Sequence, residues 1–408
     1  MNIWDLMYEK FIFKQDNITL FEAFAGIGSQ HIALKQLSDE FNFKLEVVGI
    51  SEIDKYAIQS YEAIHGKVEN YGSITDIQDI PKVDIFTYSF PCQDISLAGN
   101  QKGFSRDSGT RSGLLWEVER ILENQKELDK LPQVLLMENV KALVGIKFKD
   151  DYIEWQLKLQ ELGYTNYWEV LNAKNYGIPQ NRERVFMVSI LGKYSYNFPK
   201  PFPLKLRLKD MLEDEVDEKY YLSDKQIKGM QITKFNQYSL SKQLKDKNDI
   251  ADTILAGFDR APQVVKTLCL NSKVNGKQPS LQNRVYDSEG ISTAITTSFH
   301  PSILIPEATK KGYAEATNGD GVYINRPHQK RGVVQKGMAQ TIKTSLDVGV
   351  VDNSRIRKYT PLEVYRLMGF SDEHFDKAAS VVSNSQLYKQ AGNSIVVDVL
   401  YYIFKEMF

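Results

Sequence analysis

The sequence is poor in cysteine and contains only Cys92 and Cys269, which lie far apart in the chain. Two thiols at this separation exclude a disulfide framework and a zinc cluster built on cysteine, so we expect no metal ion in this protein. Free thiols are typical of proteins in a reducing compartment. We therefore expect the protein to be cytoplasmic.

The sequence also lacks a long hydrophobic run. No stretch approaches the length of a membrane span, and the first residues, MNIWDLMYEK, do not have the pattern of a signal peptide. We therefore expect no association with a membrane. Hydrophobic residues make up 42% and charged residues 25% of the 408 residues, which is ordinary for a soluble globular protein. This length predicts two domains, or one domain with a large insertion.

An overall excess of positive charge is missing as well, because the formal net charge is -1. The distribution of charge is uneven, however. Between Tyr220 and Val350, Lys and Arg outnumber Asp and Glu by about seven, and acidic flanks balance this excess. For a nucleic-acid partner, such local asymmetry is more informative than the total charge.

Strand-like and helical stretches alternate between Ile18 and about Ile190. We expect strands at 18–24, 45–53, 83–90, 133–140 and 184–191, and helices at 31–37, 55–64 and 114–122 between them. This alternation predicts an α/β fold with a doubly wound sheet and helices on both faces.

The composition changes at about Pro199. From 199 to 351 the apolar runs are short and Gly, Asn, Ser and Thr are frequent, which predicts a β-rich segment built from hairpins. Helical patterns return at 360–370 and 394–408. We therefore expect one α/β domain made of residues 1–198 and 352–408, with a smaller β-rich domain at 199–351.

A glycine-containing turn, FAGIG, follows the first expected strand and precedes a helix. Its glycines allow the backbone to approach a cofactor beside the helix N-terminus. Alone the motif is weak, because such turns bind dinucleotides, S-adenosylmethionine or nothing, and His31 replaces the third glycine of the dinucleotide fingerprint. Glu52 ends the second strand, where a carboxylate can hold two ribose hydroxyls, although it or Asp54 could instead cap the next helix.

Cys92 lies in the sequence FPCQ at the end of a buried strand. Ligands bind at the carboxyl ends of parallel strands, which makes Cys92 a candidate nucleophile, with a buried structural cysteine as the alternative. The following segment, 93–113, is rich in Gly and Ser and contains Lys102, Arg106 and Arg111. Long loops of this kind are often mobile lids or binding loops, and the basic side chains suit a substrate that carries phosphates.

Glu138 ends the neighbouring strand in the sequence ENV, where an unpaired buried acid would be costly. Arg182 and Arg184 alternate in the sequence QNRER at the start of a later strand, so we expect them to face the same way. Either arginine could instead form a salt bridge with Glu183 or Glu169.

These motifs resemble those of the bacterial cytosine-5 DNA methyltransferases. FAGIG resembles the family's cofactor loop, FPCQ its nucleophile motif, ENV its base-holding acid and QNRER its paired arginines. YKQAGNSI resembles the segment that returns to the cofactor pocket, and RKYTPLEVYRLMGF a structural motif before it. All six occur in the family order between residues 24 and 395. The resemblance implies a Rossmann-like, S-adenosylmethionine-dependent methyltransferase sheet, with the variable segment 199–351 as the target recognition domain.

The resemblance implies roles for individual residues. Glu52 would hold the ribose hydroxyls of S-adenosylmethionine, and Ile53 and Ile74 would contact its adenine. Ser73 stands where the family usually has aspartate, so a backbone carbonyl would have to contact the adenine amino group. Cys269 matches no motif and is expected in the core. The implied cofactor-binding residues are Phe24, Gly26, Ile27, Gly28, Glu52, Ile53, Ile74, Pro91, Asn393, Ser394 and Ile395.

The resemblance also implies a catalytic set of Cys92, Glu138, Arg182 and Arg184. Cys92 would add to carbon 6 of a cytosine flipped out of duplex DNA, which activates carbon 5 toward the methyl group. Protonated Glu138 would donate to ring N3, and Arg184 would hold the O2 oxygen.

Three other functions have to be compared with this one. A tRNA cytosine-5 methyltransferase shares the motifs, but the size of the segment 199–351 favours sequence-specific reading of DNA. A catalytically inactive DNA-binding regulator would not be expected to retain all four catalytic residues. A nicotinamide-dependent oxidoreductase fits FAGIG alone. We therefore expect a monomeric enzyme of a bacterial cytoplasm that belongs to a restriction-modification system. Its cognate restriction endonuclease would act on the same site without direct contact.

Overall fold

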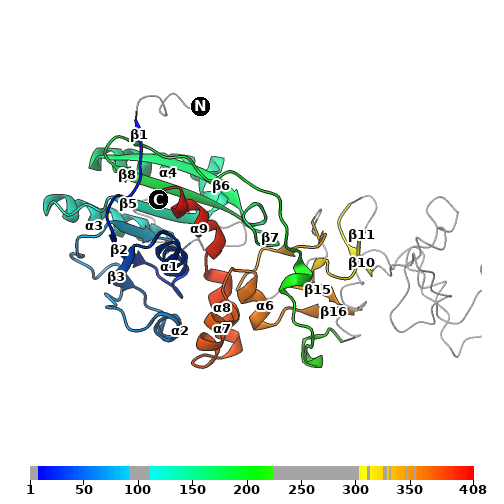
Figure 1. Ribbon diagram of the computed structural model, residues 1–408. Coiled ribbons are helices and arrows are strands. Elements are labelled where there is room, and N and C mark those ends of the chain that lie inside the picture. The colour runs from blue at the N-terminus through cyan, green and yellow to red at the C-terminus, as the bar shows by residue number, and fades with distance from the viewer. Residues whose placement is uncertain are drawn as a thin grey trace, which may run out of the picture. The chain divides into compact units, whose positions relative to one another are not determined.

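The computed structural model of this chain describes residues 8–91, 95, 111–223, 303–309, 313–324, 329, 332–344, 347–352 and 355–408 (Figure 1). The chain divides into two units. Unit 1 consists of Met1–Leu206, Thr341–Ser345 and Val364–Phe408, and unit 2 consists of Arg207–Gln340 and Leu346–Glu363. Thr341–Ser345 thus pack in unit 1, although they fall within the segment expected to form the β-rich domain.

Unit 1 is built around a six-stranded sheet with the order β3-β2-β4-β5-β8-β6. Strands β2 to β5 pair in parallel, whereas β8 is antiparallel to both β5 and β6. The expected α/β sheet is confirmed, and its last two strands add an antiparallel edge. The strand bounds are β2 (Asn17–Ala23), β3 (Lys44–Ser51), β4 (Ile85–Tyr88), β5 (Val134–Val140), β6 (Tyr164–Asn172) and β8 (Glu183–Leu191).

Helices cover both faces of this sheet. Along β2, Phe21 and Ala23 join the core cluster that also contains residues of α3 and α4, whereas Glu22 between them bonds to His31 of α1 and Tyr61 of α2. Side chains alternate across a strand, so the two helix pairs lie on opposite faces. The four helices are α1 (Ser29–Phe41), α2 (Lys55–His65), α3 (Leu115–Glu127) and α4 (Lys149–Leu162).

The central strands are buried on both faces, which explains their nearly continuous apolar sequences. All four residues of β4 are buried, as are the first six of β5. No helix among the described residues has the length and apolar character needed to cross a membrane. Shorter elements complete unit 1. These elements are β1 (Glu9–Lys10), β7 (Gln180–Asn181), β9 (Tyr194–Ser195), α7 (Asp372–Ala379), α8 (Asn384–Asn393) and α9 (Val397–Lys405); α6 (Pro361–Arg366) begins in unit 2.

The described part of unit 2 is β-rich, and its strand pairings are antiparallel. Strands β10 and β11 form a hairpin, and a four-stranded sheet has the order β13-β12-β15-β16. A small core is built from Leu222, Ile305, Val322, Val351 and Ile356 together with their neighbours. The bounds are β10 (Ile303–Pro306), β11 (Tyr313–Ala316), β12 (Gly321–Tyr323), β13 (Val334–Gln335), β14 (Ala339–Gln340), β15 (Val348–Asp352) and β16 (Arg355–Lys358).

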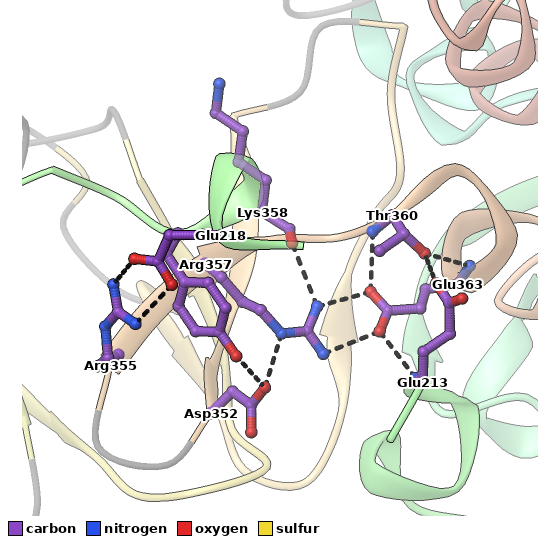
Figure 2. A network of polar contacts seen from close by, with 9 residues as sticks. Glu213, Glu218, Asp352, Arg355, Arg357, Lys358, Thr360 and Glu363 are labelled. Atoms are coloured by element: carbon purple, nitrogen blue, oxygen red, sulfur yellow. Dashed lines mark hydrogen bonds and ion pairs between the residues drawn. The ribbon is translucent and has the colours of Figure 1, made fainter. Parts of the chain in front are cut away.

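A buried network of charges holds unit 2 together near its C-terminal boundary (Figure 2). The guanidinium of Arg357 is fully buried, and it pairs with Asp352 at 2.8 Å and with both carboxylate oxygens of Glu363 at 2.8 Å. The same carboxylate accepts the backbone N–H groups of Thr360 at 2.8 Å and of Glu213 at 2.9 Å. Breaking a buried pair of this kind costs about 3–5 kcal/mol, because the remaining charge is left uncompensated.

Candidate active site

The glycine turn after β2 has an unusual backbone. Phe24, Gly26 and Gly28 have φ angles of 57°, 59° and 79°, and the first of these is uncommon for a residue with a side chain. A Cβ on Gly28 would lie 2.4 Å from Nε2 of His65, so contact as well as conformation requires glycine there. A Cβ on Gly26 would meet nothing within 4 Å. The turn therefore leaves open space beside Gly26, as a site for a bound ligand requires.

Glu52 connects the ends of β2 and β3. One carboxylate oxygen accepts the N–H of Gly26 at 2.9 Å, and the other accepts those of Ile53 and Asp54, each at 2.8 Å. Asn70 holds the backbone of Glu52 from both sides, at 3.2 Å and 3.0 Å. Asp54 caps α2 by accepting the N–H of the second helical residue at 3.0 Å. The capping role considered for either acid therefore belongs to Asp54.

The two isoleucines expected to contact adenine differ in exposure. The side chain of Ile53 is 73% exposed, which is unusual for a large apolar residue and leaves a flat apolar surface beside Glu52. Ile74 is only 3% exposed and packs in the core cluster. Helix α3 fixes the backbone around Ile74, because Arg120 donates to the carbonyls of Ile74 at 3.1 Å and Ile77 at 2.7 Å. The hydroxyl of Ser73 bonds to that of Thr75 at 2.7 Å.

The predicted nucleophile Cys92 lies outside the described residues, as do Gln93 and Cys269. The strand end that leads to Cys92 is described. The side-chain nitrogen of Asn139, a residue that is 2% exposed, donates to the carbonyl of Phe90 at 3.0 Å. Its oxygen accepts the N–H of Val140 at 2.9 Å. Asn139 has no role among the residues expected from the sequence, although an amide at a buried strand end signals a backbone contact.

Glu138 and Arg184 form an ion pair at the ends of β5 and β8. Nε of Arg184 lies 3.1 Å from Oε1 of Glu138, which is 8% exposed. In the antiparallel register Arg184 faces Val140, two residues beyond Glu138, so both side chains lie on one face. Burial raises the pKa of the Glu138 carboxyl above its usual value, despite the opposing effect of Arg184 and Arg182. A raised pKa favours the protonated form, which can donate a hydrogen bond.

Arg182 has different partners from Arg184. Its side chain is 4% exposed, and the guanidinium donates to the carbonyls of Ile342 at 2.8 Å, Ser394 at 2.7 Å and Gly392 at 3.3 Å. Three carbonyls from two distant segments thus accept from one side chain. The sequence placed Arg182 in the catalytic set, and the structure brings it to the backbone of the AGNSI motif.

The AGNSI motif lies at the end of α8. Asn393 is exposed, whereas Ser394 and Ile395 are 9% and 5% exposed. Gln390, one turn earlier, donates to the carbonyl of Tyr56 at 2.9 Å and accepts the hydroxyl of Ser60 at 3.1 Å. This residue was not identified from the sequence. It ties α8 to α2, and so holds the AGNSI motif beside the segment that follows Glu52.

A buried polar group lies beneath the glycine turn. Glu22 is fully buried and accepts the hydroxyl of Tyr61 at 2.7 Å and the N–H of His31 at 3.1 Å. Burial raises the pKa of Glu22 to about 7. His65 bonds to the carbonyl of Ile27 at 3.0 Å and stacks on His31 at 4.2 Å. Burial lowers the pKa of His31 to about 4 and that of His65 to about 3, so both rings are neutral at pH 7.

These groups gather at one edge of the sheet. Glu52, Phe90 and Asn139 follow or end parallel strands, and Arg184 begins an antiparallel strand, so all four lie at the edge formed by the carboxyl ends of the parallel strands. Ligands of α/β sheets bind at this edge. An open glycine turn, a fixed carboxylate and an exposed isoleucine fit a nucleoside, and an acid-arginine pair fits the polar edge of a base.

Comparison with known proteins identifies the family of the chain. The sequence profile of the C-5 cytosine-specific DNA methylase family matches residues 18–408. The chain is 33% identical to the type II methyltransferase M2.ScrFI of Lactococcus lactis subsp. cremoris, over 96% of this chain and 99% of that protein. It is 30% identical to the orphan methyltransferase M.SPRI of Bacillus phage SPR, over 94% of this chain and 96% of that protein. The resemblance indicated by the six motifs is confirmed.

Solved structures of similar fold include the methyltransferase EhMeth of Entamoeba histolytica, with a TM-score of 0.57 and 16% identity over 97% of this chain and 100% of that one. Another is the Dnmt2 methyltransferase of S. pombe, with a TM-score of 0.54 and 18% identity over 96% and 98% of the two chains. At these identities the likeness shows the fold alone, and it confirms the expected α/β methyltransferase sheet.

Proposed function

The chain belongs to the C-5 cytosine-specific DNA methylase family, and we propose that it methylates carbon 5 of a cytosine flipped out of duplex DNA, with Cys92 as nucleophile. The observation that carries the proposal is the ion pair of Glu138 and Arg184. Glu138 is buried on β5, the strand next to β4, which leads to Cys92, and Arg184 is half-buried on β8, the strand beyond. An acid with a raised pKa beside a guanidinium can donate to one ring atom while the arginine holds another.

In the proposed chemistry, Cys92, Glu138 and Arg184 each contact a different atom of the cytosine base. The Cys92 thiolate forms a bond to carbon 6, and protonated Glu138 donates to N3, so the ring becomes electron-rich at carbon 5. Arg184 holds the O2 oxygen in place. A free thiol has a pKa of about 8.5, so a positive environment is needed to raise the fraction of thiolate. The basic side chains of the segment 93–113, whose binding role stays a prediction, would contribute to it.

We propose that S-adenosylmethionine, when bound, supplies the methyl group. The residues present fit such a group. Glu52, fixed by three backbone N–H groups, would accept two ribose hydroxyls, and the exposed side chain of Ile53 would cover the adenine. The open turn at 24–28 and the segment 393–395 would line the rest of the pocket. Pro91 and Ile74 belong to the same proposal; the buried side chain of Ile74 leaves its backbone as the nearer group.

Sequence-specific binding is proposed for residues 199–351, which contain the basic stretch of the chain. The similarity to a type II methyltransferase supports a role in restriction-modification. In this proposal the enzyme acts as a monomer in a bacterial cytoplasm. A cognate restriction endonuclease would act on the same site without direct contact.

The test is bisulfite sequencing of DNA from a methylation-free host that expresses the chain. We expect one short sequence to be protected at a single cytosine, and we expect the Cys92→Ser variant to protect none. Labelled S-adenosylmethionine offered with duplex DNA or tRNA provides the second measurement. Label in tRNA alone would support the tRNA methyltransferase, and label in neither, from a folded protein, would support the inactive regulator.

A further inference from the structure

The segment 341–344 is anchored to the QNRER motif within unit 1. The N–H of Ile342 donates to the side chain of Gln180 at 3.0 Å, and the hydroxyl of Thr341 donates to the carbonyl of Asn181 at 2.7 Å. The carbonyl of Ile342 accepts from Arg182 at 2.8 Å. Three consecutive residues, 180–182, thus hold a segment that is 160 or more positions away in the sequence.

Arg182 also holds the AGNSI motif, by donating to the carbonyls of Ser394 at 2.7 Å and Gly392 at 3.3 Å. The two held segments touch each other as well. A Cβ on Gly392 would lie 2.4 Å from the carbonyl carbon of Lys343 and from the nitrogen of Thr344. The two backbones therefore pass in direct contact, and only glycine fits at this position.

A buried guanidinium requires acceptors, because an unpaired charge is expensive to bury. With 4% exposure, the position of Arg182 therefore depends on both segments, and each segment depends on the other through it. One segment interrupts the sequence of the proposed recognition domain, and the other leads into the proposed cofactor residues 393–395. A shift of either segment disturbs acceptors that the Arg182 guanidinium needs, and so disturbs its hold on the other segment.

We infer that Arg182 is a positioning residue that couples DNA binding to cofactor binding, because one guanidinium holds the carbonyl of Ile342 and those of Gly392 and Ser394. The inference rests on the proposed function and departs from the sequence-based placement of Arg182 in the catalytic set. Coupling of this kind is reciprocal, so DNA strengthens cofactor binding by the same factor as the cofactor strengthens DNA binding.

The test compares Arg182→Lys with the wild type. Lysine keeps the charge, but its compact ammonium cannot span three carbonyls as a planar guanidinium does. Calorimetry gives the dissociation constant of S-adenosylhomocysteine with and without a saturating duplex that carries the sequence found by bisulfite sequencing. For the wild type we expect the duplex to tighten binding by at least about 5-fold, the lower end of typical coupling. For Arg182→Lys we expect the ratio to fall to about one.

Two further variants separate coupling from other effects. Arg184→Lys should slow methyl transfer and retain the coupling ratio, because Arg184 bonds to the carbonyl of Glu183 and pairs with Glu138, and neither residue belongs to these segments. Arg366→Lys, which alters an exposed pair with Asp372 in the same unit, is the matched control and should behave as wild type. Gly392→Ala leaves Arg182 intact but separates the two backbones, so it should also lose the coupling.

The outcomes distinguish the inference from the function on which it rests. A wild-type ratio in Arg182→Lys overturns the inference. If that variant does not fold, as judged by thermal unfolding, a wild-type ratio in Gly392→Ala overturns it instead. A wild type that methylates DNA with a ratio of one also overturns the inference and leaves the proposed function intact. A wild type that binds no S-adenosylhomocysteine and methylates no DNA overturns the proposed function.

Discussion

The side chain of Asn139 donates a hydrogen bond of 3.0 Å to the carbonyl of Phe90, two residues before Cys92. This contact joins the ends of β4 and β5, and so fixes Phe90, at the strand end before the proposed nucleophile, relative to β5 and Glu138. The proposed catalytic acid and the strand end that leads to the proposed nucleophile are therefore joined by one amide as well as by the sheet.

Replacing Asn139 by Ala should lower the rate of methyl transfer and leave cofactor binding nearly unchanged. The buried carbonyl of Phe90 loses its donor, which costs about 1–3 kcal/mol and frees the strand end. Single-turnover kinetics with labelled cofactor measure the rate, and calorimetry measures affinity. An equal loss of both would mean that Asn139 supports the fold in general rather than the position of Cys92.

Glu52→Gln should weaken S-adenosylhomocysteine binding by about 1.5–3 kcal/mol, the range for losing hydrogen bonds to a charged group. The variant keeps the size of the side chain, but its amide offers one acceptor oxygen in place of two. DNA affinity measured without cofactor should barely change. Glu62→Gln, an exposed acid of α2, is the control. Unchanged cofactor affinity in Glu52→Gln would reduce Glu52 to a structural link between β2 and β3.

DNA that carries 5-fluorocytosine at the target position should trap the enzyme covalently. After Cys92 adds to carbon 6 and carbon 5 takes the methyl group, the normal enzyme removes the carbon 5 proton and expels the thiol. Fluorine cannot leave as a cation, so the thioether persists through denaturing electrophoresis.

Trapping should require S-adenosylmethionine and disappear in Cys92→Ser. Glu138→Gln should slow it by roughly 10²–10⁴-fold, the contribution of a positioned proton donor. A wild type that methylates ordinary DNA but forms no trapped complex would exclude the covalent mechanism. Trapping that persists in Cys92→Ser would show that another residue is the nucleophile, and Cys269 would be the remaining thiol to test.

The buried acid Glu22 predicts a pH-dependent difference in stability. Its pKa in the folded protein is about 7, above the ordinary value of 4.5, so folding favours the protonated form. The contribution of Glu22 to the free energy of unfolding is therefore lost as the pH rises from about 4.5 through about 7. Glu22→Gln cannot ionise, and its stability relative to wild type should increase across this window by up to about 3 kcal/mol.

Thermal unfolding of both proteins at several pH values measures this difference. The lowered pKa values of His31 and His65 give both proteins a slope of opposite sign below pH 6.5, because those rings must stay neutral when folded. The comparison with Glu22→Gln removes that common slope. A difference that stays constant from pH 4.5 to 7 would show that Glu22 does not titrate in this range.

The sequence predicted the parts of the fold that have a strong local pattern. The buried strands β4 and β5 are continuous apolar runs, and the strand-turn-helix around Gly26 and Gly28 is marked by glycine. Strand β6 has no such pattern, because its residues alternate irregularly between buried, half-buried and exposed. It was not identified, and neither was the antiparallel edge that it forms.

Contacts between distant residues could not be predicted from local pattern. Arg182 and Arg184 look equivalent in sequence, but Arg182 lies between β7 and β8, where its N–H donates to the carbonyl of Gln180 at 3.1 Å and to the side chain of Asn172 at 3.2 Å. This irregular backbone separates the two arginines. The bonds of Gln390 to α2 join residues more than 300 positions apart, and they follow from the topology alone.

The bond from Glu213 to Glu363 has a consequence for how such an enzyme diversifies. Glu213 lies near the beginning of unit 2 and Glu363 is its last residue. The hydrogen bond between them therefore holds the first and last parts of unit 2 side by side. Arg357 and Thr360 donate hydrogen bonds to the same carboxylate of Glu363. Whatever lies between these points can lengthen, shorten or change its sequence without moving the points of attachment. If the inserted chain reads DNA as proposed, selection can exchange one DNA specificity for another between two fixed points of attachment, without change to the strands that carry the proposed catalytic residues.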